Sequence, residues 1–309
     1  MKKRIIISFI GLVIMAILPF ISVQKIFSET ETPENSIEEK STDTRQFTVL
    51  DTSSNKTVRI DDREFCIGAV AYEMPVSFEE EALKAQCIAC YTHFSRLREN
   101  SSEEYDFSAD LSKGEFYKKD IPDENRRKIS QAVDAVFGQV LKDGKDKLID
   151  VAYHAISSGQ TESSKDIFGF ESEFLQPVSS AGDVNVSGYL SQKEISADRL
   201  KEIMLGENIK LNGEPEKWFG ECRRTKSGTV RSIKICDTSI SGEKMRELLG
   251  LRSANFDIEY RKDKFILTVY GYGHGVGMSQ YGANVMAQQG ADYKEILHHY
   301  YGNCNIKAV

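Results

Sequence analysis

Glu73 is the first residue whose type and spacing point to chemistry. Phe65, Ala69 and Glu73 recur every four residues, so a helix over 62–73 would end its apolar face in a carboxyl group. Met74-Pro75 should end that helix and place its negative end beside Glu73. Desolvation and the dipole both disfavour the carboxylate, which raises its pKa and yields the protonated acid that general acid catalysis needs. A solvent-facing Glu in a last helical turn is the alternative.

A glycine-rich stretch, Gly271-Tyr-Gly-His-Gly-Val-Gly-Met-Ser-Gln-Tyr-Gly282, is the second candidate. Its glycines do not fit G-x-G-x-x-G, and the chain has no Gly-Lys-Ser/Thr, so dinucleotide and phosphate loops are excluded. Alternating glycines let a backbone approach a ligand closely. The polar side chains that would line this approach are His274, Ser279, Gln280 and Tyr281. A turn with a core-packed histidine is the alternative.

A third stretch, Tyr153-His-Ala-Ile-Ser-Ser-Gly-Gln-Thr-Glu162, would end a strand in small polar residues. Ser157 and Ser158 are candidate binding hydroxyls here. A serine nucleophile is a further reading, but the stretch lacks the G-x-S-x-G elbow of hydrolases. An ordinary transition from a strand to a loop, with no functional role, would show the same pattern.

Taken together, these segments resemble the stage II sporulation protein D family of peptidoglycan lytic enzymes. The resemblance covers most of 47–306, in order. The stretches that carry it are Ala71–Phe78, Glu81–Gln86, Tyr153–Glu162, Leu248–Ser253, Gly273–Ala283 and Ile296–Tyr301.

The resemblance implies a membrane-anchored lytic transglycosylase of the engulfment machinery of spore-forming bacteria. Glu73 would be the catalytic acid that cuts MurNAc–GlcNAc bonds in glycan strands stripped of stem peptides by an amidase partner. His274, Ser279, Gln280 and Tyr281 would bind the sugars, together with Tyr91, Ser157 and Ser158. Other membrane proteins of that machinery are expected partners.

The sequence departs from the family pattern at three places. Tyr91 stands where the family has an active-site Arg. Phe174-Leu-Gln-Pro-Val178 replaces a Tyr-Leu-Lys run, so Gln176 takes the place of the Lys. Residues 99–120 contain no His or Cys, so we do not expect the zinc that some relatives bind. These changes keep a second hypothesis open, in which the chain binds glycan and recruits or enhances an amidase.

One strong acid favours transglycosylation over hydrolysis, because glycosidases commonly use two carboxylates. Glu73 would protonate the leaving oxygen. It would then take the proton of the MurNAc C6 hydroxyl as that oxygen closes a 1,6-anhydro ring. The sugar would supply its own nucleophile.

These residues must be positioned by a mixed set of elements, and α+β is the predicted fold class. Helices are expected over 62–73, 79–98, 123–137, 198–205 and 292–301, and antiparallel strands elsewhere. A hairpin is predicted between 139–142 and 147–154 around Asp143-Gly144. Residues 47–306 would form the catalytic region. An inserted second lobe over about 176–262, with a cleft between two lobes, is one arrangement that fits.

The start of the chain predicts a membrane anchor. Residues 5–23 carry no charge and follow Lys2-Lys3-Arg4, and nineteen residues at about 1.5 Å each nearly cross a core of about 30 Å. The basic flank should keep the start of the predicted anchor, residues 1–24, in the cytoplasm, so the chain that follows the anchor lies outside. A cleaved signal peptide is the alternative. Residues 25–46 are acidic and polar, typical of a flexible stalk.

Composition limits the other classes of function. The chain has 309 residues, 40% of them hydrophobic and 28% charged, with a net charge of −7, which argues against a nucleic-acid binder. No cofactor is expected. Six cysteines outside the predicted anchor show no zinc spacing. Cys222 and Cys236 flank a predicted hairpin, but a two-residue turn would pair Cys222 with Ile233 instead.

Overall fold

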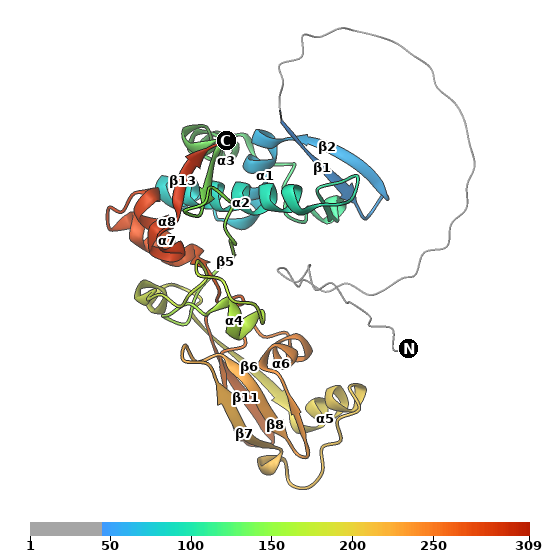
Figure 1. Ribbon diagram of the computed structural model, residues 1–309. Coiled ribbons are helices and arrows are strands. Elements are labelled where there is room, and N and C mark those ends of the chain that lie inside the picture. The colour runs from blue at the N-terminus through green and yellow to red at the C-terminus, as the bar shows by residue number, and fades with distance from the viewer. Residues whose placement is uncertain (1–44) are drawn as a thin grey trace, which may run out of the picture. The chain divides into compact units, whose positions relative to one another are not determined.

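The computed structural model describes residues 45–309, and the structural statements below concern that part of the chain. Residues 46–309 form one compact unit. Helices and strands follow one another without a regular βαβ repeat, and the strands are gathered in small two- and three-stranded sheets (Figure 1).

The helices match the apolar periodicity of the sequence closely. They are α1 (Asp62–Glu73), α2 (Glu80–Asn100), α3 (Asp123–Val136), α4 (Ser164–Ile167), α5 (Ala197–Gly206), α6 (Gly242–Leu249), α7 (Gln280–Gln288) and α8 (Tyr293–Tyr301). The five predicted helices are confirmed as α1, α2, α3, α5 and α8, with ends that move by at most two residues.

The strands are shorter than the helices and several pair over long sequence distances. They are β1 (Gln46–Asp51), β2 (Lys56–Asp61), β3 (Phe107–Ala109), β4 (Gln139–Lys142), β5 (Tyr153–His154), β6 (Leu190–Ser196), β7 (Phe219–Arg224), β8 (Val230–Ile235), β9 (Thr238–Ile240), β10 (Phe256–Arg261), β11 (Lys264–Tyr270), β12 (Met278–Ser279) and β13 (Asn305–Ala308).

Helix α2 is the centre of the first hydrophobic core. It contacts α1, α3, α7, α8 and β4, so both ends of the compact unit pack on one helix. Figure 1 shows the red α7 and α8 beside the cyan α2. This core draws its buried residues from 47–175 and 276–304.

A second core lies in the middle of the sequence, between residues 195 and 269. Its sheets have the orders β10-β11-β6 and β7-β8-β9, all antiparallel, with α5 and α6 packed on them. Trp218 stacks on Phe265 with ring centroids 5.6 Å apart. The chain leaves the first core after Leu175 and returns to it through the glycine-rich turn that follows β11.

The predicted fold class needs correction. We expected an α+β region carried by a transmembrane helix, but within residues 45–309 no helix is both long and apolar enough to cross a bilayer. Helix α2 has 21 residues, yet Glu80, Lys84 and Arg96 are among its charges. The described fold is therefore a mixed α/β arrangement. The predicted membrane segment 5–23, and the predicted stalk except for its last two residues, lie outside the described residues.

The expectation of antiparallel sheets holds for most strand pairs but not for two of them. β3 lies parallel to β1, and β12 lies parallel to β5. The predicted hairpin after β4 forms one bridge, Lys142 to Leu148, while β4 pairs along its whole length with the C-terminal β13. A local Asp-Gly signal marks a turn, but long-range packing of the apolar face decides which strand becomes the partner.

The cysteines are all free in the described residues. Cys222 pairs across the β7–β8 hairpin with Ile233, which is the register that a two-residue turn predicts.

Candidate functional site

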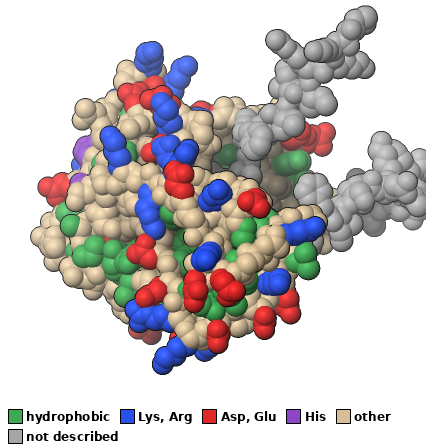
Figure 2. Space-filling view, turned by 90° about the horizontal axis from the view of Figure 1, so that it is seen from below, with side chains coloured by type: hydrophobic (Ala, Val, Ile, Leu, Met, Phe, Trp, Pro, Cys, Tyr) green, Lys and Arg blue, Asp and Glu red, His purple; other side chains and the backbone are tan. Residues whose placement is uncertain are grey.

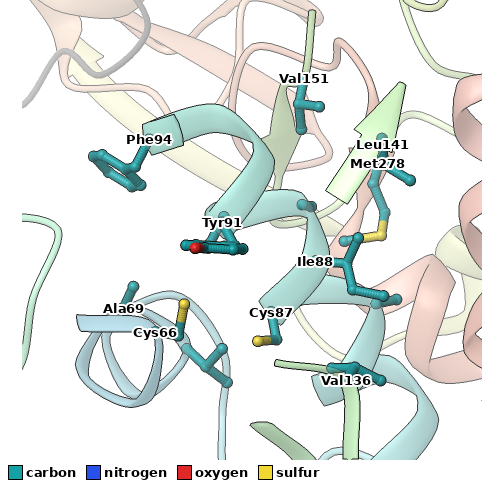
Figure 3. Close-up of a cluster of buried hydrophobic side chains, with 14 of the residues drawn as sticks. Cys66, Ala69, Cys87, Ile88, Tyr91, Phe94, Val136, Leu141, Val151 and Met278 are labelled. Atoms are coloured by element: carbon teal, nitrogen blue, oxygen red, sulfur yellow. The ribbon is translucent and has the colours of Figure 1, made fainter. Parts of the chain in front are cut away.

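Helix α1 carries Glu73 to a defined place. Asp61 caps the helix start by accepting the Arg63 and Glu64 backbone N–H groups at 3.0 and 3.1 Å. The helix ends at Glu73 because Met74, which precedes Pro75, is extended. Cys66 and Ala69 of α1 face Cys87 of α2 in the core (Figure 3), which fixes the helix against its neighbour.

Glu73 is half-buried, and this burial dominates its electrostatics. Desolvation raises the pKa of Glu73 to about 7, while a hydrogen bond from Gln280 opposes that rise. The negative end of α1 acts in the same direction as desolvation. No other carboxylate among the described residues shifts this pKa. A single carboxyl group near half-protonation at neutral pH can both donate and accept a proton.

A buried chain of polar groups leads away from Glu73. The Gln280 amide donates to Glu73 Oε2 at 3.5 Å and to Gln86 Oε1 at 3.4 Å. Gln86 donates in turn to the Cys90 sulfur at 3.1 Å, and that thiol donates to the Tyr153 hydroxyl at 3.5 Å. The network brings α1, α2, β5 and α7 together at one carboxyl group. It occupies Oε2 and leaves Oε1 of Glu73 for a ligand.

The neighbours of Gln280 on α7 hold that helix in place. Ser279 is the N-cap: its hydroxyl accepts the Gly282 N–H at 3.2 Å and donates to the Ala155 carbonyl at 3.3 Å. Tyr281 packs edge-on against Phe78 with ring centroids 4.9 Å apart. These two predicted binding residues therefore position α7 and the loop after α1 rather than contact Glu73.

His274 is tied into the glycine-rich turn. Its Nδ1 accepts the Val276 N–H at 3.0 Å, and its ring lies 5.1 Å from the Phe168 ring and 5.7 Å from the His154 ring. Burial lowers the pKa of His274 to about 3 and that of His154 to about 4. Both imidazoles are neutral at physiological pH, so His274 offers shape and packing rather than charge.

Ser157 and Ser158 join the loop after β5 to its surroundings. The Ser157 N–H donates to the buried Asp183 carboxylate at 2.8 Å. The Ser158 hydroxyl donates to the Ser227 carbonyl at 2.9 Å, which links this loop to the β7–β8 hairpin. Neither serine contacts Glu73.

Tyr91 lies in the first core and is 2% exposed (Figure 3). Its hydroxyl donates to Asp62 at 3.0 Å, and Arg98 binds the same carboxylate at 2.6 Å. Asp62 begins α1 and Glu73 ends it, which separates them by about 16 Å at 1.5 Å per residue. The predicted sugar contact from Tyr91 thus falls at the opposite end of α1 from the acid.

The remaining departures from the family pattern lie on the segment after α4. Phe174 is partly buried against the first core, and Gln176 is exposed with its amide donating to the Ser172 carbonyl at 2.5 Å. No group of three or more His, Cys, Asp or Glu side chains within residues 45–309 is arranged to hold a metal ion. Burial lowers the pKa of His93, a histidine on α2, to about 4.

Gln86 and Tyr153 were not singled out from the sequence. Gln86 is fully buried, and its place on the apolar stripe of α2 between Leu83 and Cys90 was a readable signal. A buried polar residue on such a stripe requires a partner. Tyr153 carried no comparable signal, because only the fold brings β5 to α2.

Comparisons with known proteins agree with this geometry. A family model described as stage II sporulation protein matches residues 51–142, which contain α1, α2 and Glu73. Stage II sporulation protein D of Bacillus amyloliquefaciens is 33% identical over 272 residues, covering 84% of this chain and 77% of that protein. Its counterpart in Bacillus subtilis (strain 168) is 31% identical over 278 residues, covering 84% and 78%. An amidase enhancer of Bacillus subtilis is 25% identical over 287 residues, covering 76% of this chain but 39% of the enhancer.

Proposed function

The chain belongs to the stage II sporulation protein D family, and on that premise we propose that it is a lytic transglycosylase of the cell wall. Its substrate would be the MurNAc–GlcNAc bond of glycan strands stripped of stem peptides, which places its action outside the cytoplasm. The observation that supports this most is Glu73, a half-buried carboxyl group with a pKa of about 7 and one oxygen left open.

The reaction needs only this acid. The Glu73 proton passes to the glycosidic oxygen, which leaves as the 4-hydroxyl of GlcNAc. The C6 hydroxyl oxygen of MurNAc attacks C1, and its proton passes to the Glu73 carboxylate. One C–O bond breaks and one forms, no water is consumed, and Glu73 ends the cycle protonated. The Gln280 amide holds Oε2 throughout, so Oε1 carries the proton.

The charges on the described surface argue against a nucleic acid as the ligand. On the face shown in Figure 2, acidic and basic side chains are interspersed rather than gathered by sign. That face offers no extended basic surface of the kind that binds nucleic acids.

A second candidate is a glycan-binding protein that enhances an amidase. The similarity to the amidase enhancer supports it, as does the replacement of the expected Arg by a tyrosine that lies in the core. In that case Glu73 would bind the glycan without cutting it, and an amidase would be the functional partner.

Product analysis separates the two. Purified full chain is incubated with peptide-stripped glycan strands, and the ends are analysed by mass spectrometry. The transglycosylase produces 1,6-anhydro-MurNAc ends, 18 Da lighter than the reducing ends that a hydrolase leaves, as the loss of one water requires. Uncut stripped strands, together with faster peptide release from peptide-bearing peptidoglycan by an added N-acetylmuramoyl-L-alanine amidase, would establish the enhancer instead.

A further inference from the structure

Two exposed tyrosines have no part in the mechanism above. Tyr72 directly precedes Glu73 in the last turn of α1 and is 42% exposed. Tyr272 lies in the glycine-rich turn and is 45% exposed. Exposed aromatic rings near a candidate acid offer a contact surface for a ligand.

The backbone under Tyr272 is held rigidly. Tyr272 and Ile156 exchange both backbone hydrogen bonds, at 3.0 and 2.7 Å. Gly271 and Gly273 on either side have φ of 75° and 107°. A Cβ on them would lie 2.7 Å from the Ile156 carbonyl oxygen and 2.8 Å from the His154 Cβ, respectively. Only glycine fits both positions, and the clamp directs the one side chain between them outward.

The same strand segment ties Tyr272 to the acid. Ile156 follows Tyr153 by three residues, about 10 Å along an extended chain. Tyr153 belongs to the hydrogen-bonded network that ends at Glu73. The electrostatics agree, because after burial it is Glu73, and then Glu115 and Tyr272, that raise the pKa of Tyr72. The two rings and the carboxyl group therefore share one surface.

One face of the Tyr272 ring is already covered. The Arg252 guanidinium lies 4.4 Å from its centroid in a cation–π contact. The residue is still 45% exposed, so this contact leaves much of the ring open to solvent. A ring backed on one side and open on the other suits a flat, partly apolar ligand. The C–H faces of pyranose rings have that character, while their hydroxyls stay in water.

We propose that Tyr72 and Tyr272 form a sugar-stacking platform that binds N-acetylated pyranose rings of the glycan next to Glu73. This inference rests on the proposed function for the identity of the ligand. Aromatic rings supply large contact areas at little cost in side-chain entropy, so two of them can hold a strand by its sugar rings.

The test measures binding separately from cleavage. Full-length chain carrying Glu73→Gln is titrated by calorimetry with peptide-stripped glycan strands, so turnover cannot interfere. Tyr272→Ala and Tyr72→Ala, each added to it, should weaken affinity about 3–10-fold, as expected for one lost aromatic contact. Tyr272→Phe should bind as the parent does, because stacking uses the ring and not the hydroxyl. Phe137→Ala is the matched control, since Phe137 is 39% exposed and packs against Tyr91, at the far end of α1.

The outcomes are distinct. Unchanged affinity in both alanine variants overturns the platform, as does an equal loss in Tyr272→Phe, which would indicate a hydroxyl contact. A loss matched by Phe137→Ala, or by a lower thermal midpoint, would indicate a general structural effect and also overturns it. If the two alanine variants lose affinity while the unmodified chain forms no anhydro ends, the platform stands and the transglycosylase proposal falls.

Discussion

Glu73 and Glu162 are both carboxyl groups withdrawn from water, but they are satisfied very differently. Glu162 is 2% exposed and accepts the Thr225 hydroxyl at 2.7 Å and the Thr229 N–H at 3.3 Å. Glu73 is more open, and its one hydrogen bond, from Gln280, is 3.5 Å long. Burial raises the pKa of both groups. The raised pKa alone therefore does not tell a reactive acid from a structural one.

The difference lies in where the oxygens point. Glu162 binds the β7–β8 hairpin from the loop after β5, and its own N–H donates to the Gly275 carbonyl at 2.7 Å. It thereby ties the second core to the glycine-rich turn. Glu73 closes no such link between elements through its open oxygen. A carboxyl group with a free oxygen can move a proton, whereas one that is fully bonded holds the fold.

The sharpest test of this contrast is the same substitution at both positions. Glu73→Gln keeps the shape and removes the transferable proton, so release of anhydro ends should fall by about 10²–10⁴-fold. Glu162→Gln keeps an acceptor for the Thr225 hydroxyl, so the protein with this substitution should cleave the glycan at close to the parental rate. Initial rates on stripped glycan, with circular dichroism as the folding check, measure both.

Equal losses in the two variants would contradict the distinction. So would a Glu73→Gln protein that releases anhydro ends as fast as the parent, because the acid would then be another group.

For stability the order should be reversed, so that substitution of Glu162 destabilises the fold more than substitution of Glu73. Glu162→Ala leaves the buried Thr225 hydroxyl without its acceptor and removes one of the two acceptors of the Thr229 N–H, which should lower the free energy of unfolding by about 1–3 kcal/mol. Glu73→Ala removes a poorly bonded carboxyl group and should cost less. Urea unfolding monitored by tryptophan fluorescence is suited to this, since Trp218 lies in the second core that Glu162 anchors. A larger loss in Glu73→Ala would reverse the assignment.

Helix positions could be predicted from the sequence because the information is local. The spacing of Phe65, Ala69 and Glu73, followed by Pro75, placed α1 to the residue. Strand partners could not be predicted in the same way. β4 pairs with β13 and β5 with β12 across more than a hundred residues, and no local pattern encodes such a choice.

The candidate site could likewise be predicted only in part from the sequence. Gln280 does contact Glu73, but Ser279 and Tyr281 beside it turned out to hold α7. Polar residues in one motif look alike in sequence, and only the direction of each side chain separates a ligand contact from a helix cap. Tyr91 was predicted at the site from a family position, whereas its burial depends on Asp62 and Arg98 at the other end of α1.

A further difference between the two carboxyl groups is that Gln280, itself bonded to Gln86, positions Glu73. Gln86→Met keeps the volume but removes the acceptor that orients the Gln280 amide, so activity should fall about tenfold through loss of positioning. The weaker Gln280 bond should also raise the pKa of Glu73, because that bond opposes the effect of burial. The alkaline limb of the rate profile should then move to higher pH. Gln192→Met, at an exposed position in β6, is the control.

A rate loss without a shift of the alkaline limb would indicate that Gln86 acts only through packing. The proposed positioning role would then be wrong.

The last expected effect is on the pH dependence of stability. Glu73 has a pKa of about 7 in the folded protein against an ordinary value of 4.5. Between these values the folded protein keeps a proton that the unfolded chain has released, so this group's contribution to stability is full below pH 4.5 and is lost as pH rises to about 7. His154 and His274 act in the opposite direction, because their lowered pKa values remove stability as pH falls below 6.5. The pH dependence of stability of the parent protein therefore combines the opposing contributions of Glu73 and of the two histidines.

The difference between variant and parent isolates Glu73. Glu73→Gln cannot titrate at that position, while the histidine contributions are common to both proteins and cancel. The free energy of unfolding of the variant, relative to the parent, should therefore rise from pH 4.5 to about 7 and stay level above it. Urea unfolding at half-unit pH steps and constant ionic strength measures this. A difference that is constant from pH 4 to 8 would mean that Glu73 ionises normally in the folded protein, and the case for it as the proton donor would lose its electrostatic basis.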